Sequence, residues 1–582
     1  MRVGPTIERL RLRLAAVDTV PQLAALGIVC GLLSAAVIIA FRITIEGAQI
    51  ALLPGNEAGG YEALPLALRL ALPVAGGAFI GLVLQFVARR SAELGVVHVM
   101  ERLAYHQGRL PFRNAAAQFL GAAASIAAGH SVGREGPSVH LGAASGSLLG
   151  QHLGLPFNSI RTLVGCGVAA AIAAGFNTPI AGVIFAMEVV MMEYTIAGFA
   201  PVILSAVGAT ALTRLVFGSA PAFSVPALQL GSILELPIVL AMGLAIGAMA
   251  ALYITLQRMF IVHGAVLPLW VRTTLAGAVT GLCAMAYPQV MGIGYDTVGA
   301  ALAGQIGLSL LVGIAAFKLL ATAAAIGLGL PGGLIGPTLV IGATAGGAMG
   351  LIAHQVLPGD VASHGFYAMI GMGAMMGATL QAPLSALMAM LELTANPNII
   401  FPGMLAVISA GIVSRYGFGC DSVYLMQMKA RGLDYRNDPV AQTLRAVSVG
   451  RAMNHNFVTT APRVGHADAG ALLRNEPLWI VVQNADGPDV LMPGADLARH
   501  LGEENAAAAD GSPADIDLMA IPASRLQIAG ISLRSTLQDA LEELTESRAD
   551  ALAVFHGASP RSRRIVGIVT RKAIEGYYLY GR

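Results

Sequence analysis

Long stretches almost free of charged side chains are the feature that most limits the fold of this 582-residue chain. In residues 114–187 the only charged side chains are Arg134, Glu135 and Arg161, and residues 304–391 contain two. A membrane-crossing helix needs about 20 apolar residues, so each stretch is long enough for several helices. Charged residues make up 12% of the chain, against about 25% in a typical soluble domain. The sequence therefore predicts an α-helical polytopic membrane protein.

The texture of the sequence changes after about Lys429, where polar residues become frequent. Short apolar runs then recur, LWIVV from Leu478, ALAVF from Ala551 and IVGIV from Ile565, and they indicate strands of a soluble α/β domain. The predicted divisions are an N-terminal segment at 1–20, a membrane domain of two halves at 21–425, a linker at 426–445, and two soluble units at 446–505 and 517–582.

Four arginines, Arg2, Arg9, Arg11 and Arg13, precede the first long apolar run. No convincing cleavage site follows them, so the segment is expected to be retained. Basic residues beside a membrane helix favour the cytoplasmic side. We therefore expect both termini in the cytoplasm and a multi-pass protein in the lipid bilayer of the inner or plasma membrane. The alternative for the arginines is an interfacial helix without a role in orientation.

Net charge and residue spacing exclude several other classes of protein. A formal net charge of +2 gives no basic footprint for nucleic acid. The four cysteines lack the spacing of a disulfide framework or a zinc site, so no metal is expected. His98, His130 and His140 lie near Glu135 in the sequence without the HExxH spacing of a metalloprotease. We expect no enzyme activity.

The uncharged region contains an internal repeat. GREGPSVHLGAASGSLLG and GGLIGPTLVIGATAGGAMG share a Gly-Pro pair followed by three glycines at intervals of four. The matched residues lie 200 positions apart: Gly136 and Gly336, Pro137 and Pro337, Gly142 and Gly342, Gly146 and Gly346, and Gly150 and Gly350. NTPIAGVIFAME and QAPLSALMAMLE match at an offset of 204. The membrane domain is therefore predicted to consist of two related halves, as in many transporters that bind substrate between repeats.

Each repeat places a Gly-rich turn before a proline and an apolar helix, and proline is favoured at the start of a helix. Helix N-termini present unpaired N–H groups and the positive end of the macrodipole, which favour an anion. Two such ends that meet would form an anion site without a full positive charge. The GxxxG faces are interpreted as packing surfaces. Arg134 and Glu135 are functional candidates because ionisable residues inside a membrane are costly, with a structural pair as the alternative.

The same motifs resemble those of the CLC family of chloride channels and chloride/proton antiporters. The signature segments are GHSVGREGP at 129–137 and PGGLIGP at 331–337, with support from FNTPIAGVIFAMEVV at 176–190, LQAPLSALMAMLELT at 380–394 and DSVYL at 421–425. The resemblance implies a CLC-type inverted-repeat fold, a homodimer, and one pathway per subunit for chloride and for other anions or protons, under voltage or pH control.

The resemblance also assigns roles to single residues. Glu135 matches the gating glutamate, a tethered carboxylate that competes with the anion and can carry a proton. The positions that match the family's anion-binding region are Arg134, Gly136, Leu334, Ile335, Gly336, Tyr424 and Leu94.

Two departures from the family pattern affect the predicted mechanism. Leu94 stands where an anion-coordinating serine or histidine is expected, which removes one ligand and leaves nitrate and other halides as alternatives to chloride. Val189 stands where proton-coupled members usually carry an inner glutamate, and the neighbouring Glu188 remains. A channel is the leading hypothesis, and an antiporter with a non-standard inner proton route is the alternative. Fluoride exporters of the family usually have GREGT and lack the tyrosine, so Pro137 and Tyr424 favour chloride.

The soluble tail reads as two strand–helix–strand–strand–helix units. The second, at 530–579, resembles a CBS domain, and the first, near 449–501, is a weaker match. CBS pairs frequently bind adenine nucleotides, for which Asp496 and Thr570 are the candidate residues, although Ala573 replaces the acid expected after Thr570. No other cofactor is expected, and a structural dimer clamp is the leading interpretation.

Overall fold

The computed structural model describes residues 20–580, except 55–57, 88–92, 194–195, 220–222, 224–228, 358–360, 434–438, 485–488, 508–514 and 557–563. The described chain divides into two compact units. One is helical and comprises residues 20–152 and 160–435, and the other comprises 436–582 together with 153–159. The N-terminal arginines on which the predicted orientation depends lie outside the described residues.

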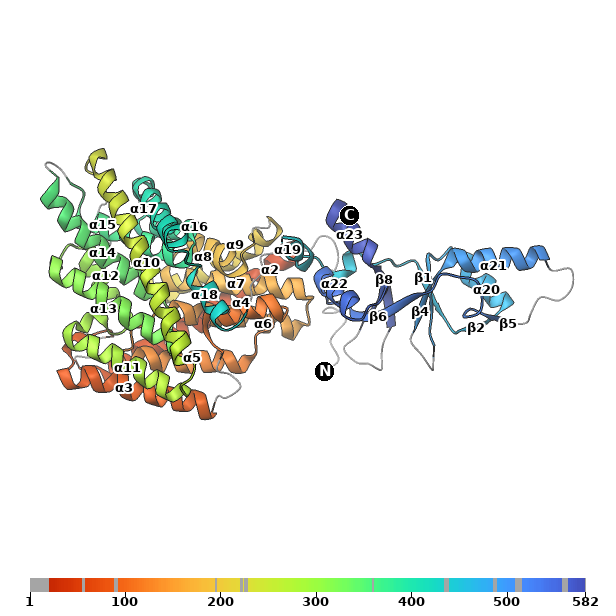
Figure 1. The fold of residues 1–582 in the computed structure, drawn as a ribbon, viewed down its shortest axis with the longest axis horizontal. Coiled ribbons are helices and arrows are strands. Elements are labelled where there is room, and N and C mark those ends of the chain that lie inside the picture. Colours follow the sequence, from red (N-terminus) through yellow and green to blue (C-terminus); the bar gives the residue numbers. More distant parts are fainter. Residues whose placement is uncertain are drawn as a thin grey trace. The chain divides into compact units, whose positions relative to one another are not determined.

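Two series of helices build the first unit (Figure 1). The first series is α2 (Val20–Leu52), α3 (Leu66–Leu82), α4 (Gly95–Tyr105), α5 (Phe112–Ala127), α6 (Glu135–Leu153), α7 (Phe157–Phe176), α8 (Pro179–Phe185) and α9 (Ile196–Phe217). The second is α10 (Leu236–Gly264), α11 (Leu269–Ala286), α12 (Tyr295–Leu302), α13 (Leu308–Gly327), α14 (Ile335–Val356), α15 (His364–Leu380), α16 (Pro383–Thr394), α17 (Ile400–Ile412) and α18 (Val423–Ala430). The repeat is visible in this order, because α5 to α8 correspond to α13 to α16.

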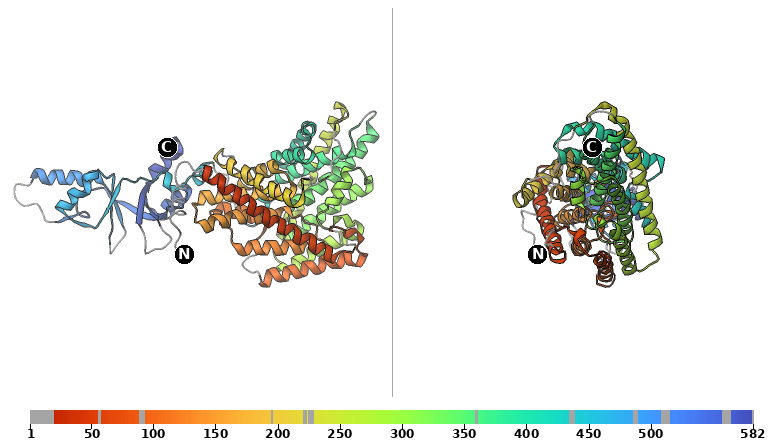
Figure 2. Two further views of the ribbon diagram at one scale, coloured as in Figure 1. Left: turned by 180° about the vertical axis from the view of Figure 1, so that it is seen from behind. Right: turned by 90° about the vertical axis from the view of Figure 1, so that its left-hand side faces the viewer.

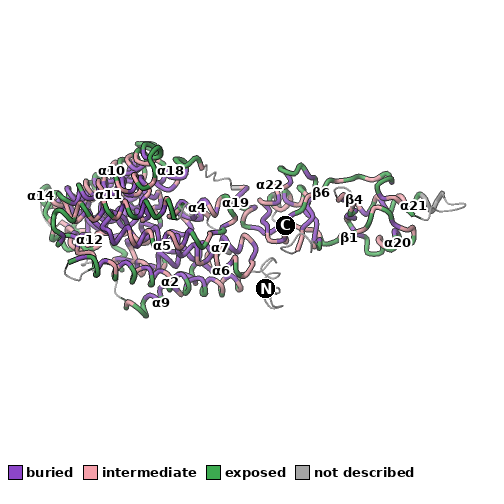
Figure 3. The backbone as a smooth tube through the Cα atoms, turned by 90° about the horizontal axis from the view of Figure 1, so that it is seen from below, coloured by how far each residue is buried: buried purple, intermediate pink, exposed green. Residues whose placement is uncertain are grey.

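Nine of the described helices are long and apolar enough to cross a membrane. Their outer faces expose large apolar side chains such as Leu215, Val262 and Ile408, and α2 lies along the outside of the unit (Figure 2). Buried backbone is concentrated inside the unit (Figure 3). Apolar side chains exposed on this scale suit contact with lipid, and the prediction of a multi-pass membrane protein is confirmed.

Glycines of the repeat allow the backbones of neighbouring helices to come into direct contact. A Cβ on Gly142 would lie 2.2 Å from the backbone oxygen of Gly167 in α7, and a Cβ on Gly342 would lie 2.4 Å from that of Gly371 in α15. The predicted interpretation of the GxxxG faces as packing surfaces is confirmed for both repeats. Because any larger residue would push α6 from α7 or α14 from α15, these glycines set how closely the two helices of each pair can pack.

The second unit contains the predicted α/β domain. After α19 (Pro439–Arg445), its elements are β1 (Phe457–Thr460), β2 (Arg463–Gly465), α20 (His466–Leu472), β3 (Trp479–Val482), β4 (Val490–Pro493), α21 (Gly494–Ala507), β5 (Asp515–Asp517), β6 (Leu526–Ser532), α22 (Leu537–Glu546), β7 (Ala551–His556), β8 (Arg564–Thr570) and α23 (Arg571–Tyr580).

One six-stranded sheet, in the order β1-β3-β4-β6-β7-β8, joins two copies of the strand–helix–strand–strand–helix unit. Within each copy the first pair of strands is parallel and the second is antiparallel. The copies meet where β4 pairs with β6. Side chains from both copies, including Val481, Leu491 and Ile565, share one buried cluster beneath the sheet.

Candidate functional site

The two signature loops meet directly in the buried interior of the helical unit. The backbone N–H of Gly133 donates to the oxygen of Gly333 at 2.6 Å, and the N–H of Gly333 donates to the oxygen of Gly133 at 2.7 Å. A Cβ on Gly136 would lie 2.8 Å from the Cα of Gly333, so a side chain there would separate the loops. This antiparallel bridge joins repeat positions 200 residues apart and places the start of α6 beside the start of α14.

The carboxylate of Glu135 is held at the N-terminus of the opposite repeat helix. Its Oε2 accepts a hydrogen bond from the backbone N–H of Gly336 in α14 at 3.1 Å, and its Oε1 accepts one from the hydroxyl of Tyr295 in α12. Only 3% of Glu135 is exposed. A buried carboxylate is stabilised by N–H donors and by the positive end of a helix macrodipole. The side chain therefore occupies the kind of place that a free anion would take.

Arg134 lies beside this carboxylate and is shared between two acids. Its guanidinium nitrogens lie 3.8 Å from Oε1 of Glu135 and 3.7 Å from Oε1 of Glu46 in α2. Its guanidinium also stacks on the ring of Tyr295, 5.4 Å from the ring centre. These separations exceed hydrogen-bond length, so Arg134 acts on Glu135 through its charge.

A cavity of about 570 Å³ approaches the same helix ends. Among its lining residues are four that the sequence predicted for the anion site, namely Leu94, Gly136, Leu334 and Tyr424. Ile335 and Gly336 follow in the first turn of α14, where the N–H of Gly336 contacts Glu135. The predicted anion-binding positions are thus brought together from α4, α6, α14 and α18.

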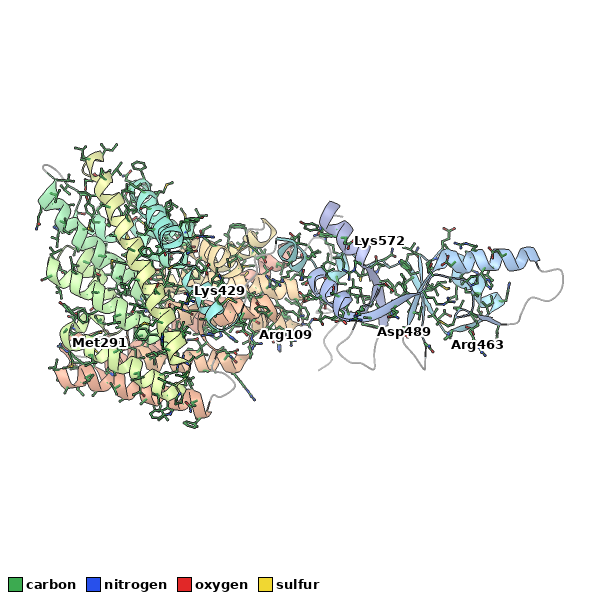
Figure 4. All side chains as sticks on the ribbon, in the orientation of Figure 1. Arg109, Met291, Lys429, Arg463, Asp489 and Lys572 are labelled. Carbon is green, nitrogen blue, oxygen red and sulfur yellow. The ribbon has the colours of Figure 1, made fainter. Side chains whose placement is uncertain are left out.

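Tyr424 is buried in α18, with 3% of its surface exposed. Its hydroxyl has no hydrogen-bond partner among the described residues. Ser422 caps the start of α18 by accepting from the N–H of Leu425. Lys429, labelled in Figure 4, lies near the end of this helix and pairs with Asp421 at 2.6 Å. Buried hydroxyls are nearly always hydrogen-bonded, so this donor on the cavity wall is a group suited to a ligand.

Gln118 in α5 is a cavity residue that the sequence analysis missed. Its Oε1 accepts from the backbone N–H of Gly95 at 2.6 Å, at the start of α4, and lies 3.1 Å from Nδ1 of His140. Because a backbone N–H is always a donor, the amide oxygen must face Gly95. Its Nε2 is buried without a hydrogen-bond partner among the described residues. A lone amide in the apolar run AAAQFLGAAA was the available sequence signal.

The inner proton position predicted from the family is apolar and buried at Val189, which is 6% exposed. The neighbouring Glu188 accepts from the backbone N–H groups of Leu384, at 3.1 Å, and Ser385, at 2.7 Å, at the start of α16. Glu392 in α16 does the same for Ile180 and Ala181 at the start of α8, at 2.9 and 2.7 Å. Glu188, from the first repeat, thus caps α16 of the second repeat, and Glu392 of the second repeat caps α8 of the first.

In the tail, the two residues proposed for nucleotide binding make internal contacts. Asp496 in α21 accepts from the side chain of Arg499 at 3.1 Å and from the backbone N–H of Ser524 at 3.0 Å. Thr570, at the end of β8, accepts from the N–H of Ala573 at 3.3 Å. They belong to different copies of the repeated unit.

Comparison with known proteins gives consistent matches. The family model described as voltage gated chloride channel matches residues 76–415. A putative chloride channel protein ClcB-like from Ralstonia nicotianae is 36% identical over 371 residues, which cover 62% of this chain and 86% of that protein. An H(+)/Cl(-) exchange transporter ClcA from Salmonella arizonae is 30% identical over 310 residues, which cover 51% of this chain and 65% of that protein.

Solved structures show the same fold. A slow cyanobacterial Cl-/H+ antiporter aligns with a TM-score of 0.62 and 22% identity, over 72% of this chain and 99% of that chain. A eukaryotic CLC transporter aligns with a TM-score of 0.59 and 20% identity, over 95% of this chain and 97% of that chain.

Proposed function

Because this chain belongs to the CLC family of voltage-gated chloride channels, and is a CLC-type anion transport protein, we propose that it conducts chloride through a pathway gated by Glu135. The observation that carries the proposal is the hydrogen bond from Gly336 N–H to the Glu135 carboxylate. A carboxylate at this helix end competes with chloride for the same donor. Protonation removes its charge and weakens that hydrogen bond, and the side chain can then leave the helix end to the anion.

Two neutral donors on the cavity wall support anion coordination further along the pathway. Tyr424 offers a hydroxyl and Gln118 an amide NH2 group, both buried and without partners among the described residues. Gln118 would supply the donor that Leu94 lacks, since it comes from a neighbouring helix to the start of α4. Neutral donors bind a halide without trapping it as a full positive charge would.

The channel hypothesis is favoured by the inner end of the pathway. Val189 cannot carry a proton, and both oxygens of Glu188 accept backbone hydrogen bonds. The alternative, a chloride/proton antiporter with a non-standard inner route, is favoured by the relatives that are named exchangers and antiporters.

Flux from liposomes that contain the purified full-length protein separates these two functions. Chloride efflux and internal pH are followed together at several membrane voltages. A channel dissipates a chloride gradient without moving protons against their own gradient. Uphill proton movement driven by chloride would overturn the channel assignment in favour of the antiporter.

Substitution of Glu135 by Gln or Ala tests the gate itself. Both variants lack the charge that competes with chloride, so we expect faster chloride flux at neutral pH and loss of its pH dependence. An unchanged pH profile in either variant would remove Glu135 from the gating role.

We propose a homodimer and interpret the C-terminal α/β unit as a CBS pair that clamps the dimer. An adenine nucleotide is the alternative ligand of this pair. Saturable binding of ATP or AMP that is lost in Asp496→Ala would establish the nucleotide role, and absence of binding would favour the clamp.

A further inference from the structure

Three potential metal ligands lie close together outside the anion site described above, and two of them, both glutamates, line the cavity. They are Glu93, just before α4, and His98 and Glu101 within it. Their ligand atoms lie within 4.8 Å of one another. Nδ1 of His98 lies 3.6 Å from Oε2 of Glu93 and 3.6 Å from Oε2 of Glu101.

His98 gives this cluster a property that an ordinary group of surface acids lacks. Its side chain is fully buried, and its Nδ1 has no hydrogen-bond partner among the described residues. The 3.6 Å separations are too long for hydrogen bonds. A buried imidazole nitrogen that faces two carboxylate oxygens in this way is suited to bind a cation.

We propose that Glu93, His98 and Glu101 bind one divalent transition-metal cation of the Zn²⁺ type. Ligand atoms at about 2.1 Å from a tetrahedral Zn²⁺ lie about 3.4 Å from one another, which is close to the observed spacing. One imidazole and two carboxylates suit Zn²⁺, whereas Mg²⁺ prefers six oxygens. A partly exposed Glu93, 58% accessible at its side chain, provides the route of entry, and water completes the coordination.

The residues around the cluster would have to rearrange slightly when an ion binds. Nδ2 of Asn114 donates to the backbone oxygen of Glu93 at 3.0 Å and lies 3.3 Å from Nε2 of His98. A metal at Nδ1 requires the ring proton on Nε2, so metal binding would move the Asn114 amide away from Nε2. Positive groups already face these carboxylates: Arg102 lies 4.0 Å from Glu93, His106 lies 3.7 Å from Glu101, and Arg431 lines the same cavity and interacts with both acids through its charge. The ion would take the place of the pairs with Arg102 and His106.

A cation here would alter the approach of anions. Glu93 and Glu101 line the same cavity as Tyr424 and Gln118, and their negative charges oppose the entry of chloride. A bound divalent cation cancels both charges and raises the local anion concentration. Zn²⁺ is therefore expected to speed chloride flux at low chloride and low ionic strength. This consequence rests on the proposed transport function, whereas the binding itself does not.

Calorimetric titration of the chelator-treated full chain with Zn²⁺ tests the binding. We expect one ion per chain, no competition from excess Mg²⁺, and at least tenfold weaker binding in His98→Ala and in Glu101→Gln. His263→Ala, which removes an exposed histidine of α10, is the matched control and should bind normally. Glu101→Gln preserves size if His98→Ala fails to fold. Absence of stoichiometric Zn²⁺ binding, or equal binding in both variants, overturns the site.

Flux measurements test the effect on transport. Zn²⁺ should accelerate chloride efflux from liposomes relative to a chelator, and the double variant Glu93→Gln, Glu101→Gln should be fast without Zn²⁺ and insensitive to it. Normal flux that ignores bound Zn²⁺ would overturn the regulatory role and leave the proposed transport function standing. A complete lack of chloride flux in the chelator-treated wild type would instead contradict the transport function.

Discussion

At the scale of single residues, the position of the Glu135 carboxylate depends on hydrogen-bond partners that come from distant parts of the chain. Tyr295 donates to the carboxylate from α12, and the loop before Tyr295 is tied down by Lys318, whose ammonium donates to the oxygens of Val290 and Gly292 at 2.9 and 2.8 Å. The fully buried Lys318 thus has a structural role, in that it orders the segment that presents Tyr295 to Glu135.

The variant Tyr295→Phe removes one of the two hydrogen bonds that hold the carboxylate at the helix end. A hydrogen bond to a charged group contributes about 1.5 to 3 kcal/mol, so the bound position of the side chain should lose population and chloride flux at neutral pH should rise several-fold. Tyr367→Phe is the control, because it removes a hydroxyl that donates to another carboxylate, that of Glu235, at 2.6 Å and outside the cavity lining. Equal flux in the two variants would show that Tyr295 does not hold the gate.

Gln118→Glu tests whether the amide NH2 group contacts the anion. The new carboxylate keeps an acceptor for Gly95 and replaces the donor facing the cavity with an acceptor, so we expect chloride flux to fall at least tenfold and the order of halide permeability to change. Gln257→Glu makes the same change at a buried amide outside the cavity lining and should affect stability alone. An unaltered permeability order in Gln118→Glu would exclude the amide from the pathway.

These residues also show what could be predicted from the sequence. Glu135, Gly336 and Tyr424 could be predicted as site residues because the motifs that contain them resemble family signatures. Gln118 and Tyr295 could not, because their roles come from contacts with segments far away in the sequence, and sequence spacing reports only neighbours within one helix or strand. The role proposed for His98 likewise depends on Glu93, which lies outside the helix that carries His98.

At the scale of elements, the reciprocal caps hold the two halves together. Short helices such as α8 and α16 expose N–H groups at their first turns, and each cap comes from the opposite half of the membrane unit. The sequence showed that Glu188 and Glu392 match, yet the pairing could not be read from it, because a repeat in sequence does not reveal which face one copy presents to the other.

Removal of either cap should destabilise both halves. We expect Glu188→Ala and Glu392→Ala each to lower stability by about 1 to 2 kcal/mol, since each leaves two N–H groups unpaired. Thermal denaturation in detergent measures the loss. Glu193→Ala, which breaks the side-chain pair with Arg161, gives a comparison without a capping effect. A stabilising or neutral result at Glu188 would contradict the capping role.

At the scale of the whole molecule, the fold class was predictable because charge depletion and the change after Lys429 divide the chain into apolar and mixed regions. The helical unit includes α18, and α19 belongs to the second unit, because the helix that carries Tyr424 contributes to the cavity. The sequence could not predict that both tail copies join in one sheet. The two copies are joined by the pairing of the edge strands β4 and β6, and no sequence motif marks which edge strands pair.

That single sheet predicts cooperative unfolding of the tail. Because both copies share this sheet and one buried cluster, the isolated segment 439–582 should unfold in one calorimetric transition. Leu491→Ala removes a fully buried side chain from that cluster and should lower the free energy of unfolding by about 2 to 5 kcal/mol, so the whole transition should shift to lower temperature. Two separate transitions, of which only one shifts, would show that the copies fold independently.

The hydrogen bond between Glu135 and Gly336 has a further consequence for how such a protein responds to its surroundings. A blocking group attached to the wall has a fixed effective concentration, set by the length of its own side chain. Under the gating proposed for Glu135, free chloride must compete with that constant concentration, so the fraction of open pathways is expected to vary with the chloride concentration as well as with pH. The same few atoms would then both close the pathway and make its opening depend on the transported ion.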